Sequence, residues 1–284
     1  MQVNSLKFSG HESFHCRPFW LKKGFDFVKT NQVFNDYAGI ELGVGKNMVA
    51  SIRFWLKSFD IVDNNDQLTE LANKLFTDDG WDPFIEDEAT LWLLHFNLCA
   101  KNYSSIYHLI FSELRKVRPE FTKNHFMSQV HEIESKQSEN IVGKDFTVFT
   151  RTYFGKPSKD KEESFSGLFT ELNLLTELGT DNNNNHLYHI SNSKQDKIPW
   201  QVILYCIVEN DNYSNSISFS SLFTDENGVG KLFAFSQDGL ESKLMEISEN
   251  TKDVVYKNDA GVKELQFKNK TPNGLEILNS YYAK

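Results

Sequence analysis

Features that mark secreted or membrane proteins are scarce in this sequence. Only three of its 284 residues are cysteines, Cys16, Cys99 and Cys206. Their odd number and wide spacing exclude a disulfide framework and a cysteine-based zinc site, and they fit a reducing compartment. No run approaches the roughly 18 apolar residues of a transmembrane helix, and the first residues lack an apolar signal core. We therefore expect a cytoplasmic protein that does not enter a membrane.

Proline and glycine are also infrequent, with 6 and 15 residues, which excludes a collagen-like chain. Hydrophobic residues make up 39% of the sequence, and its 24 phenylalanines supply enough apolar surface for a sizeable core. This composition excludes a disordered chain and a coiled coil. At roughly 100–200 residues per domain, the length predicts two or three domains.

Basic residues are in deficit over the whole chain, which carries 30 Lys and Arg against 39 Asp and Glu, a net charge of −9. The deficit is unevenly distributed. Residues 1–60 carry eight basic and five acidic residues, a net of +3, whereas residues 61–150 carry eight and fifteen, a net of −7. A polyanion such as DNA is therefore expected to bind within the first 60 residues.

Hydrophobic periodicity predicts a mainly α protein with small β wings. Near the N-terminus it indicates a short helix over 37–41, a glycine turn, an amphipathic helix over 48–59 and a β-hairpin over 61–69. This order is typical of a winged helix-turn-helix.

The C-terminal end has a similar outline. Its predicted elements are helices over 200–208 and 219–223, a longer helix within 231–247 and a hairpin over 254–267. The tetrapeptide GVGK occurs at 43–46 and again at 228–231, which weakly supports a duplication.

Between the two modules the pattern is mostly helical. It predicts helices over 86–118 with a break near Asn102, over 121–134, 146–154 and 168–178, an exposed charged loop over 155–163, a turn over 181–186 and a strand over 187–190. We therefore predict an N-terminal winged-helix-like DNA-binding module over 1–80, a helical middle domain over 81–195 and a C-terminal winged-helix-like module over 196–284.

The segment GVGKNMVASIRFW, residues 43–55, is the strongest local signal for DNA binding. The second helix of a helix-turn-helix enters the major groove by its N-terminal end, where Lys46 and Asn47 lie. Asn pairs with adenine, Lys contacts phosphate or guanine, and Arg53 lies two turns further on to contact the backbone. The alternative is an ordinary glycine turn with solvated side chains. Arg17 and Lys22 are further candidate DNA contacts in the same basic region.

GVGKN also resembles a nucleotide-binding loop, but the match is incomplete. A phosphate loop has glycine five residues before its Gly-Lys pair and Ser or Thr after it. This sequence has Ile40 and Asn47 at those positions, so no nucleotide is expected.

The segment GHESFHCR, residues 10–17, contains His11, Glu12 and His15 at the spacing of a zinc-protease helix. Pro18 limits any helix here to about two turns. Three interpretations stay open: a zinc hydrolase, a polar catalytic cluster for phosphodiester chemistry, or hydrogen bonds that brace the fold.

Asp82, Glu86 and Asp87 form an acidic group that suits a hard cation such as Mg²⁺ or Mn²⁺. The alternative is that these carboxylates cap a helix N-terminus. Asp145, with Arg151 nearby, is interpreted either as part of a site or as a member of an ion pair. His95 lies in an apolar run and is expected to be a core histidine.

Four segments in this order resemble one bacterial family: FSGHESFHCRPFWLKKG, GVGKNMVASIRFWL, WDPFIEDEATLWLLHF and DFTVFTRTYF followed by LFTELNLL. The family comprises the SspB-like proteins, the DNA-nicking component of single-stranded DNA phosphorothioate modification systems. The resemblance covers residues 8–178 clearly and the C-terminal segment more loosely.

The resemblance implies a role in defence against phages. Such systems replace a non-bridging phosphate oxygen by sulfur on one strand, and the nick would open the backbone for this modification. It implies DNA and three protein partners: a cysteine desulfurase, an ATP-dependent sulfur-transfer protein and an ATPase. Lys46, Asn47 and Arg53 would carry the DNA-binding role, but no catalytic set is transferred. A non-catalytic DNA-binding adaptor or regulator of a defence operon is the alternative function.

Overall fold

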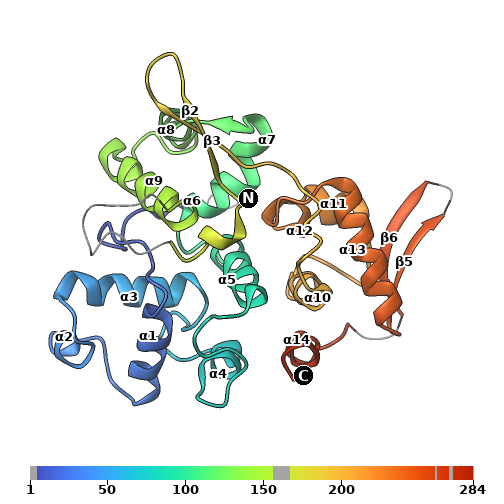
Figure 1. Cartoon of the computed structure of the whole chain (residues 1–284), viewed down its shortest axis with the longest axis horizontal. Coiled ribbons are helices and arrows are strands. Elements are labelled where there is room, and N and C mark those ends of the chain that lie inside the picture. Colours follow the sequence, from blue (N-terminus) through green and yellow to red (C-terminus); the bar gives the residue numbers. More distant parts are fainter. Residues whose placement is uncertain (1–4, 156–166, 260, 269–270, 284) are drawn as a thin grey trace. The chain divides into compact units, whose positions relative to one another are not determined.

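The computed structural model describes residues 5–155, 167–259, 261–268 and 271–283. The chain divides into two compact units, Met1–Ile190 (unit 1) and Ser191–Lys284 (unit 2), coloured from blue to yellow and from yellow to red in Figure 1. Unit 1 contains the predicted N-terminal module together with most of the predicted middle domain. The three-part division therefore stays a prediction.

Unit 1 begins with short helices joined by tight turns. These are α1 (Trp20–Lys29), α2 (Ala38–Glu41), α3 (Lys46–Ser58) and α4 (Glu70–Phe76), with a β-bridge between Val62 and Leu68 after α3. The predicted helix over 48–59 is confirmed as α3, which begins at Lys46 because Gly45 is the extended N-cap residue. Its buried face includes Ile52 and Trp55, both fully covered, so apolar burial fixes this helix in the core.

The predicted central helix is confirmed as α5 (Glu88–Ala100). Apolar side chains surround it, and all its residues between the two ends are buried. His95 is fully buried, and its Nδ1 lies 2.7 Å from the hydroxyl of Tyr153. The prediction of a core histidine is therefore confirmed.

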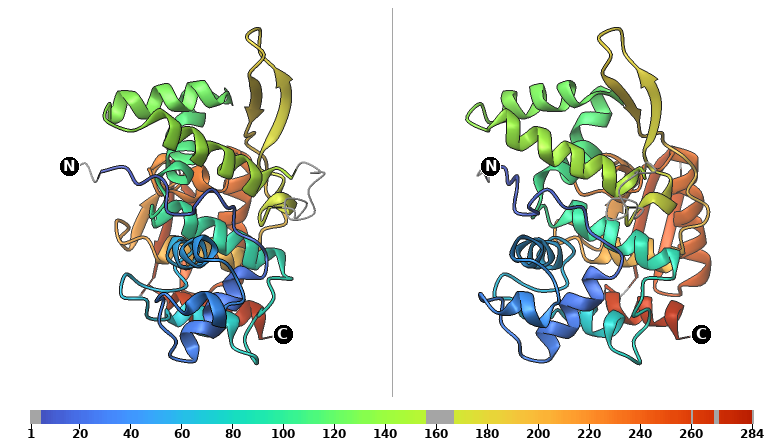
Figure 2. Two further views of the ribbon diagram at one scale, coloured as in Figure 1. Left: turned by 90° about the vertical axis from the view of Figure 1, so that its left-hand side faces the viewer. Right: turned by 60° about the vertical axis from the view of Figure 1, so that its left-hand side comes forward.

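The rest of unit 1 is built from helices and one small sheet. They are α6 (Ser105–His108), the π-helix η1 (Leu109–Leu114), α7 (Arg115–Val117), β1 (Glu120–Phe121), α8 (Lys123–Ile133), α9 (Glu139–Tyr153), the 3₁₀ turn η2 (Thr170–Leu172), β2 (Thr176–Thr180) and β3 (His186–His189). The antiparallel sheet has the order β1-β3-β2, and the β2–β3 hairpin extends beyond α8 and α9 (Figure 2).

The predicted helix over 168–178 is wrong. Asn173 adopts a left-handed conformation with φ of 51°, which ends the 3₁₀ turn, and the chain then enters β2. The following residues pair with β3, so sheet hydrogen bonds override the helical pattern. The predicted turn over 181–186 and strand over 187–190 are confirmed. The predicted charged loop over 155–163 lies almost wholly outside the described residues.

Unit 2 combines helices with a second three-stranded sheet. Its elements are α10 (Trp200–Val208), β4 (Ser216–Ser218), α11 (Phe219–Thr224), α12 (Val229–Leu232), α13 (Gln237–Asn250), β5 (Val254–Asp259), β6 (Val262–Phe267) and α14 (Gly274–Tyr282). The sheet is antiparallel, with the order β4-β6-β5. The predicted helices and the C-terminal hairpin are confirmed, and the fold is mainly α with small β parts. Among the described residues, no helix combines the length and apolar character needed to cross a bilayer.

The two GVGK segments do not form equivalent structures. In the first copy the second glycine, Gly45, is the N-cap of the long helix α3. In the second copy the first glycine, Gly228, is the N-cap of the four-residue helix α12, and Gly230 lies inside that helix. The shared tetrapeptide is therefore no sign of a structural repeat.

Substitution of Gly10 tests how closely the N-terminal segment packs on α3. Gly10 has φ of +99°, and an added Cβ would lie 2.5 Å from Cδ2 of Phe54. We expect Gly10→Ala to lower the free energy of unfolding of unit 1 by about 2–4 kcal/mol, through strain and overpacking. Urea denaturation followed by tryptophan fluorescence measures this, since four of the five tryptophans lie in unit 1.

Gly43→Ala is the matched control, because Gly43 also has positive φ, +59°, but an added Cβ would meet nothing within 4 Å. Its expected cost is the backbone strain alone, about 1 kcal/mol. Equal losses in the two variants would show that the contact with Phe54 is unimportant.

Candidate nucleic-acid interface

One face of α3 presents basic and polar side chains to solvent. Lys46, Ala50, Arg53 and Lys57 follow one another at intervals of four, three and four residues, so they form a single stripe along the helix. Lys46 is 90% exposed, Arg53 is 45% exposed and Lys57 is mostly covered. Asn47 and Ala50 are exposed beside them. The structure thus brings Lys46, Asn47 and Arg53 together on one surface.

The N-terminal end of α3 is suited to an anion. Its N-cap residue, Gly45, has no side chain that accepts a hydrogen bond from the N–H groups of the first turn, and no acidic residue lies in that turn. These N–H groups and the helix dipole favour a negative charge. Lys46 is the first residue of the helix, and its Nζ lies 3.7 Å from Asp36 on the preceding segment.

The hairpin after α3 places a carboxylate against the same stripe. Asp66 accepts hydrogen bonds from Arg53 Nε at 3.0 Å and Arg53 Nη2 at 2.6 Å, and Lys57 Nζ lies 3.0 Å from its Oδ1. Burial opposes the ionisation of Asp66, but the hydrogen bonds from Arg53 and Lys57 outweigh it and lower the pKa of this carboxyl. The hydrogen bonds to Asp66 also raise the pKa of Arg53. Two of the three cations are therefore held by an internal anion.

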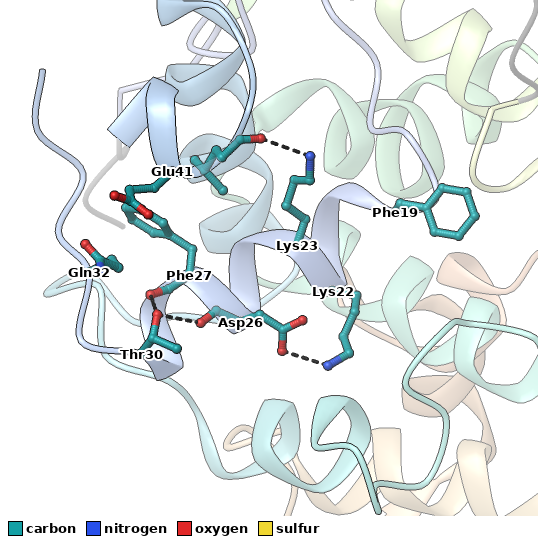
Figure 3. A pocket seen from close by; sticks show the side chains of 9 residues that line it. Phe19, Lys22, Lys23, Asp26, Phe27, Thr30, Gln32 and Glu41 are labelled. Atoms are coloured by element: carbon teal, nitrogen blue, oxygen red, sulfur yellow. Dashed lines mark hydrogen bonds and ion pairs between the residues drawn. The ribbon is translucent and has the colours of Figure 1, made fainter. Parts of the chain in front are cut away.

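Lys22 lies on α1, in a separate hollow of about 440 Å³ that Lys23 and Leu42 also line (Figure 3). Its Nζ lies 2.7 Å from Asp26 and 3.1 Å from Asp78. Burial acts to lower the pKa of Lys22, but these two carboxylates outweigh burial and raise it. Because both contacts neutralise its charge, the predicted DNA contact of Lys22 requires them to open and stays a prediction.

Arg17 is half-buried, and its guanidinium lies over the ring of Trp20 at 5.3 Å from the ring centroid. This contact orients the side chain at the start of α1. The predicted role of Arg17 in DNA binding likewise stays a prediction.

The segment around His11, Glu12 and His15 is a turn and not a helix. The N–H of Phe14 donates to the carbonyl of His11 at 2.8 Å, and Glu12 and Ser13 have left-handed φ angles of 47° and 68°. His11 and His15 are buried, whereas Glu12 is exposed. The helix face that a zinc hydrolase requires is therefore not formed, and the described residues contain no cluster of three His, Cys, Asp or Glu able to hold a metal ion.

His11 instead belongs to a buried polar contact with α9. Asp145, 1% exposed, accepts the N–H of Ser9 at 3.1 Å on one oxygen and 3.0 Å on the other. Nε2 of His11 lies 3.2 Å from Asp145 Oδ1, without the alignment of a hydrogen bond. The N–H of Ser13 donates to Nδ1 of His11 at 3.2 Å, so the neutral ring carries its proton on Nε2, facing Asp145. Asp145 is thus part of a buried polar contact with Ser9 and His11, and its interpretation as a site residue or as a member of an ion pair stays a prediction.

The same histidine packs on the core face of α3. Its ring stacks on Trp55 with centroids 5.9 Å apart and meets Phe54 edge-on at 5.6 Å. Trp55 in turn donates from Nε1 to the carbonyl of Phe14 at 3.1 Å. The turn that carries exposed Glu12 is thus fixed from both sides. Sequence reasoning missed this partnership because Ser9 and Asp145 are 136 residues apart.

The acidic group before α5 caps that helix. Asp82 is buried, and its two oxygens accept the N–H groups of Glu86 at 2.9 Å and Asp87 at 3.0 Å. Asp87 is the N-cap residue of α5 and accepts the N–H of Ala89 at 2.8 Å. Asp87 therefore caps α5, Asp82 braces the turn just before the helix, and Glu86 is the exposed carboxylate of the three. A role in binding Mg²⁺ or Mn²⁺ stays a prediction.

Comparisons with known proteins place the chain in a family. Residues 8–282 match the model of the family described as "Protein of unknown function (DUF4007)", and the chain belongs to that family. A comparison with curated proteins finds no match.

Among solved structures, the chain has the fold of SspB. A magnesium-bound SspB crystal structure matches with a TM-score of 0.85, and another SspB crystal structure matches with 0.82. Each is 23% identical to this chain, and each match covers 99% of this chain and 88% of the other. The predicted resemblance to SspB-like proteins is confirmed at the level of the fold.

Replacement of Asp145 tests the buried contact. Asp145→Ala removes the acceptor of the Ser9 N–H and the carboxylate that faces Nε2 of His11, so we expect a loss of about 1–3 kcal/mol in the free energy of unfolding of unit 1. Urea denaturation measures the loss. Asp79→Ala, at an exposed position, is the control and is expected to change stability by less than about 0.5 kcal/mol. A similar small effect of Asp145→Ala would contradict the structural role.

Proposed function

We propose that this protein binds DNA through the exposed stripe of α3. The observation that carries the proposal is the alignment of Lys46, Arg53 and Lys57 on one helix face, with Asn47 and the uncapped N–H groups at the helix start. Lysine and arginine supply phosphate contacts, and Asn47 supplies a base-reading amide. Ala50 lies between the cations and is small enough to let the helix approach a groove closely.

We further propose that both ends of the chain are winged helix-turn-helix modules. In unit 1 the order α2, α3 and the bridge between Val62 and Leu68 supports a recognition helix followed by a short wing. In unit 2 the order α10, β4, α11, α13, β5 and β6, with the sheet order β4-β6-β5, supports the same architecture.

The proposed biological role is in single-strand DNA phosphorothioate modification and antiphage defence. Its support is the fold shared with SspB together with the basic stripe. In this role the protein acts with a cysteine desulfurase, an ATP-dependent sulfur-transfer protein and an ATPase, and it nicks one DNA strand. The alternative is a DNA-binding adaptor or regulator that leaves strand cleavage to a partner.

For nicking, we propose Glu12 as the catalytic residue and His11 and His15 as its positioning residues. Glu12 is exposed at the tip of the turn, where DNA has access to its carboxylate. His11 is 2% exposed and His15 is 8% exposed, so they act by holding the turn. Both oxygens of Asp82 and one oxygen of Asp87 already accept backbone N–H groups, so no chemical step is assigned to a metal ion at Asp82, Glu86 and Asp87.

Alanine replacement on the stripe tests DNA binding. We expect Lys46→Ala to weaken binding of a short duplex about tenfold and to reduce the slope of log K against log salt by about 0.9, because one phosphate contact is lost. Lys46→Ala with Arg53→Ala is expected to reduce the slope by about twice as much. Fluorescence anisotropy over a salt series gives both quantities.

Lys136→Ala is the control, since Lys136 is an exposed lysine of unit 1 outside α3. It is expected to leave the affinity and the salt slope unchanged. DNA binding that survives the double replacement intact would rule out α3 as the DNA-binding surface.

Relaxation of a supercoiled plasmid tests nicking. We expect the purified protein to produce open-circle DNA and Glu12→Gln to lose this activity while retaining DNA binding. Parallel reactions with Mg²⁺, Mn²⁺ or EDTA establish whether an ion takes part, and Glu86→Gln examines the second acidic group. Glu132→Gln is the control at an exposed position on α8. Absence of open-circle product alongside Lys46-dependent binding would favour the adaptor over the nickase.

A further inference from the structure

A hollow of about 600 Å³ lies against the basic stripe of α3. The segment before α2 forms one side through Phe34 and Asn35, α2 contributes Ile40, and α3 forms the other side through Lys46, Ala50 and Arg53. Its volume is within the roughly 300–1,000 Å³ typical of sites for small organic groups. The hollow therefore opens on the surface to which the DNA-binding proposal assigns phosphate contacts.

Apolar groups at this hollow are exposed to an unusual degree. Ile40, which lines it, is 78% exposed, and Tyr37 on the same segment is 73% exposed. These are among the most exposed large apolar side chains of the described residues. Phe34 lies deeper and presents an aromatic wall. Ile40 and the ring of Phe34 at one concave site indicate a bound group with apolar faces.

Polar and charged groups surround these apolar walls. The guanidinium of Arg53 lies over the ring of Phe34, 5.7 Å from its centroid. Lys46 is 90% exposed, and its Nζ lies 3.7 Å from Asp36, which also lines the hollow. Oδ1 of Asn35 accepts the N–H of Tyr37 at 2.8 Å, which fixes the amide and leaves its NH₂ group as a donor. The hollow thus brings together the aromatic ring of Phe34, the side-chain amide of Asn35 and the cations Lys46 and Arg53.

We propose that this hollow binds one unpaired base of a DNA strand whose neighbouring phosphates lie on the α3 stripe. An unpaired base has flat apolar faces for Phe34 and Ile40 and polar edges for Asn35, and it carries the phosphates that Lys46 and Arg53 attract. A paired base offers only its edge in a groove and cannot enter. The inference rests on the proposed DNA binding and names the form of DNA that the surface prefers.

Filling the hollow from α3 tests the proposal. Ala50 is exposed and lines the hollow, so Ala50→Leu occupies part of it without altering the buried face of the helix. Anisotropy is measured with a fully paired duplex and with the same duplex carrying one unpaired base, and 2-aminopurine at the unpaired position reports its environment. Circular dichroism verifies that the variants fold.

The native protein is expected to bind the duplex with the unpaired base about tenfold more tightly than the paired duplex, and the 2-aminopurine signal is expected to change on binding. Ala50→Leu should bring the affinity ratio close to one, and because the ratio compares the two duplexes on the same variant, it corrects for any change in affinity that both duplexes share. Ile40→Ala should reduce the ratio. Val117→Ala is the matched control, because Val117 is 76% exposed and lies on α7, away from the hollow. Its ratio should equal that of the native protein.

Three results would overturn the inference. A native protein that binds both duplexes equally, with affinity that still depends on Lys46, leaves the proposed DNA binding intact and removes the base site. A preference for the unpaired base that Ala50→Leu does not alter places the base elsewhere. If Lys46→Ala leaves the affinity for both duplexes unchanged, the DNA-binding proposal itself is contradicted, and the proposed base site is contradicted with it.

Discussion

The buried carboxylate of Asp145 determines how the N-terminal segment lies on the helical core. A charge taken out of water is costly unless hydrogen bonds and charges compensate it. Here the N–H of Ser9 donates to both oxygens of Asp145. His11 lies on the same N-terminal segment as Ser9, and its Nε2 is 3.2 Å from Oδ1 of Asp145. The ring of His11 then stacks on Trp55, so one anion on α9 fixes the loop that covers α3. The positive φ angles of Ser9, Glu12 and Ser13 are costly in isolation, and this network of contacts maintains them.

The fixed loop separates the roles of neighbouring residues. His11 is held in the interior, and Glu12, the next residue, is exposed at the tip of the turn. A side chain at the tip of a rigid turn has less conformational freedom to lose when it meets a ligand than one on a free loop. Zinc-protease spacing thus occurs in the sequence for a reason unrelated to a zinc helix: the two histidines are buried in the fold, and the glutamate between them is exposed.

The features that the sequence predicted well depend on local pattern, and those it missed depend on distant partners. The helix α3 and the C-terminal hairpin follow from periodicity and turn residues, and the capping alternative for Asp82 and Asp87 follows from their position before an apolar helix. The contact between His11 and Asp145 has no local signal, because one partner is in the first turn of the chain and the other is on α9. Likewise, the pattern at 168–178 looks helical, but pairing with β3 makes part of it a strand.

The excess of acidic residues, a net charge of −9, extends to the α3 surface, where Asp66 pairs with two of the cations. Asp66 already occupies Arg53 and Lys57, so a DNA phosphate must exchange with this carboxylate at those two cations. This exchange gives a less favourable free energy of binding than a phosphate gains at a cation with no carboxylate partner, because the attraction to Asp66 is lost. For the proposed DNA complex we therefore expect a modest sequence-independent attraction, with the highly exposed Lys46 making the first phosphate contact. A surface with weak general attraction gains selectivity from a neighbouring site that recognises shape. The hollow beside Phe34 is the proposed site of this kind, so on the proposed interface we expect discrimination between DNA forms to depend more on an inserted base than on the number of charges.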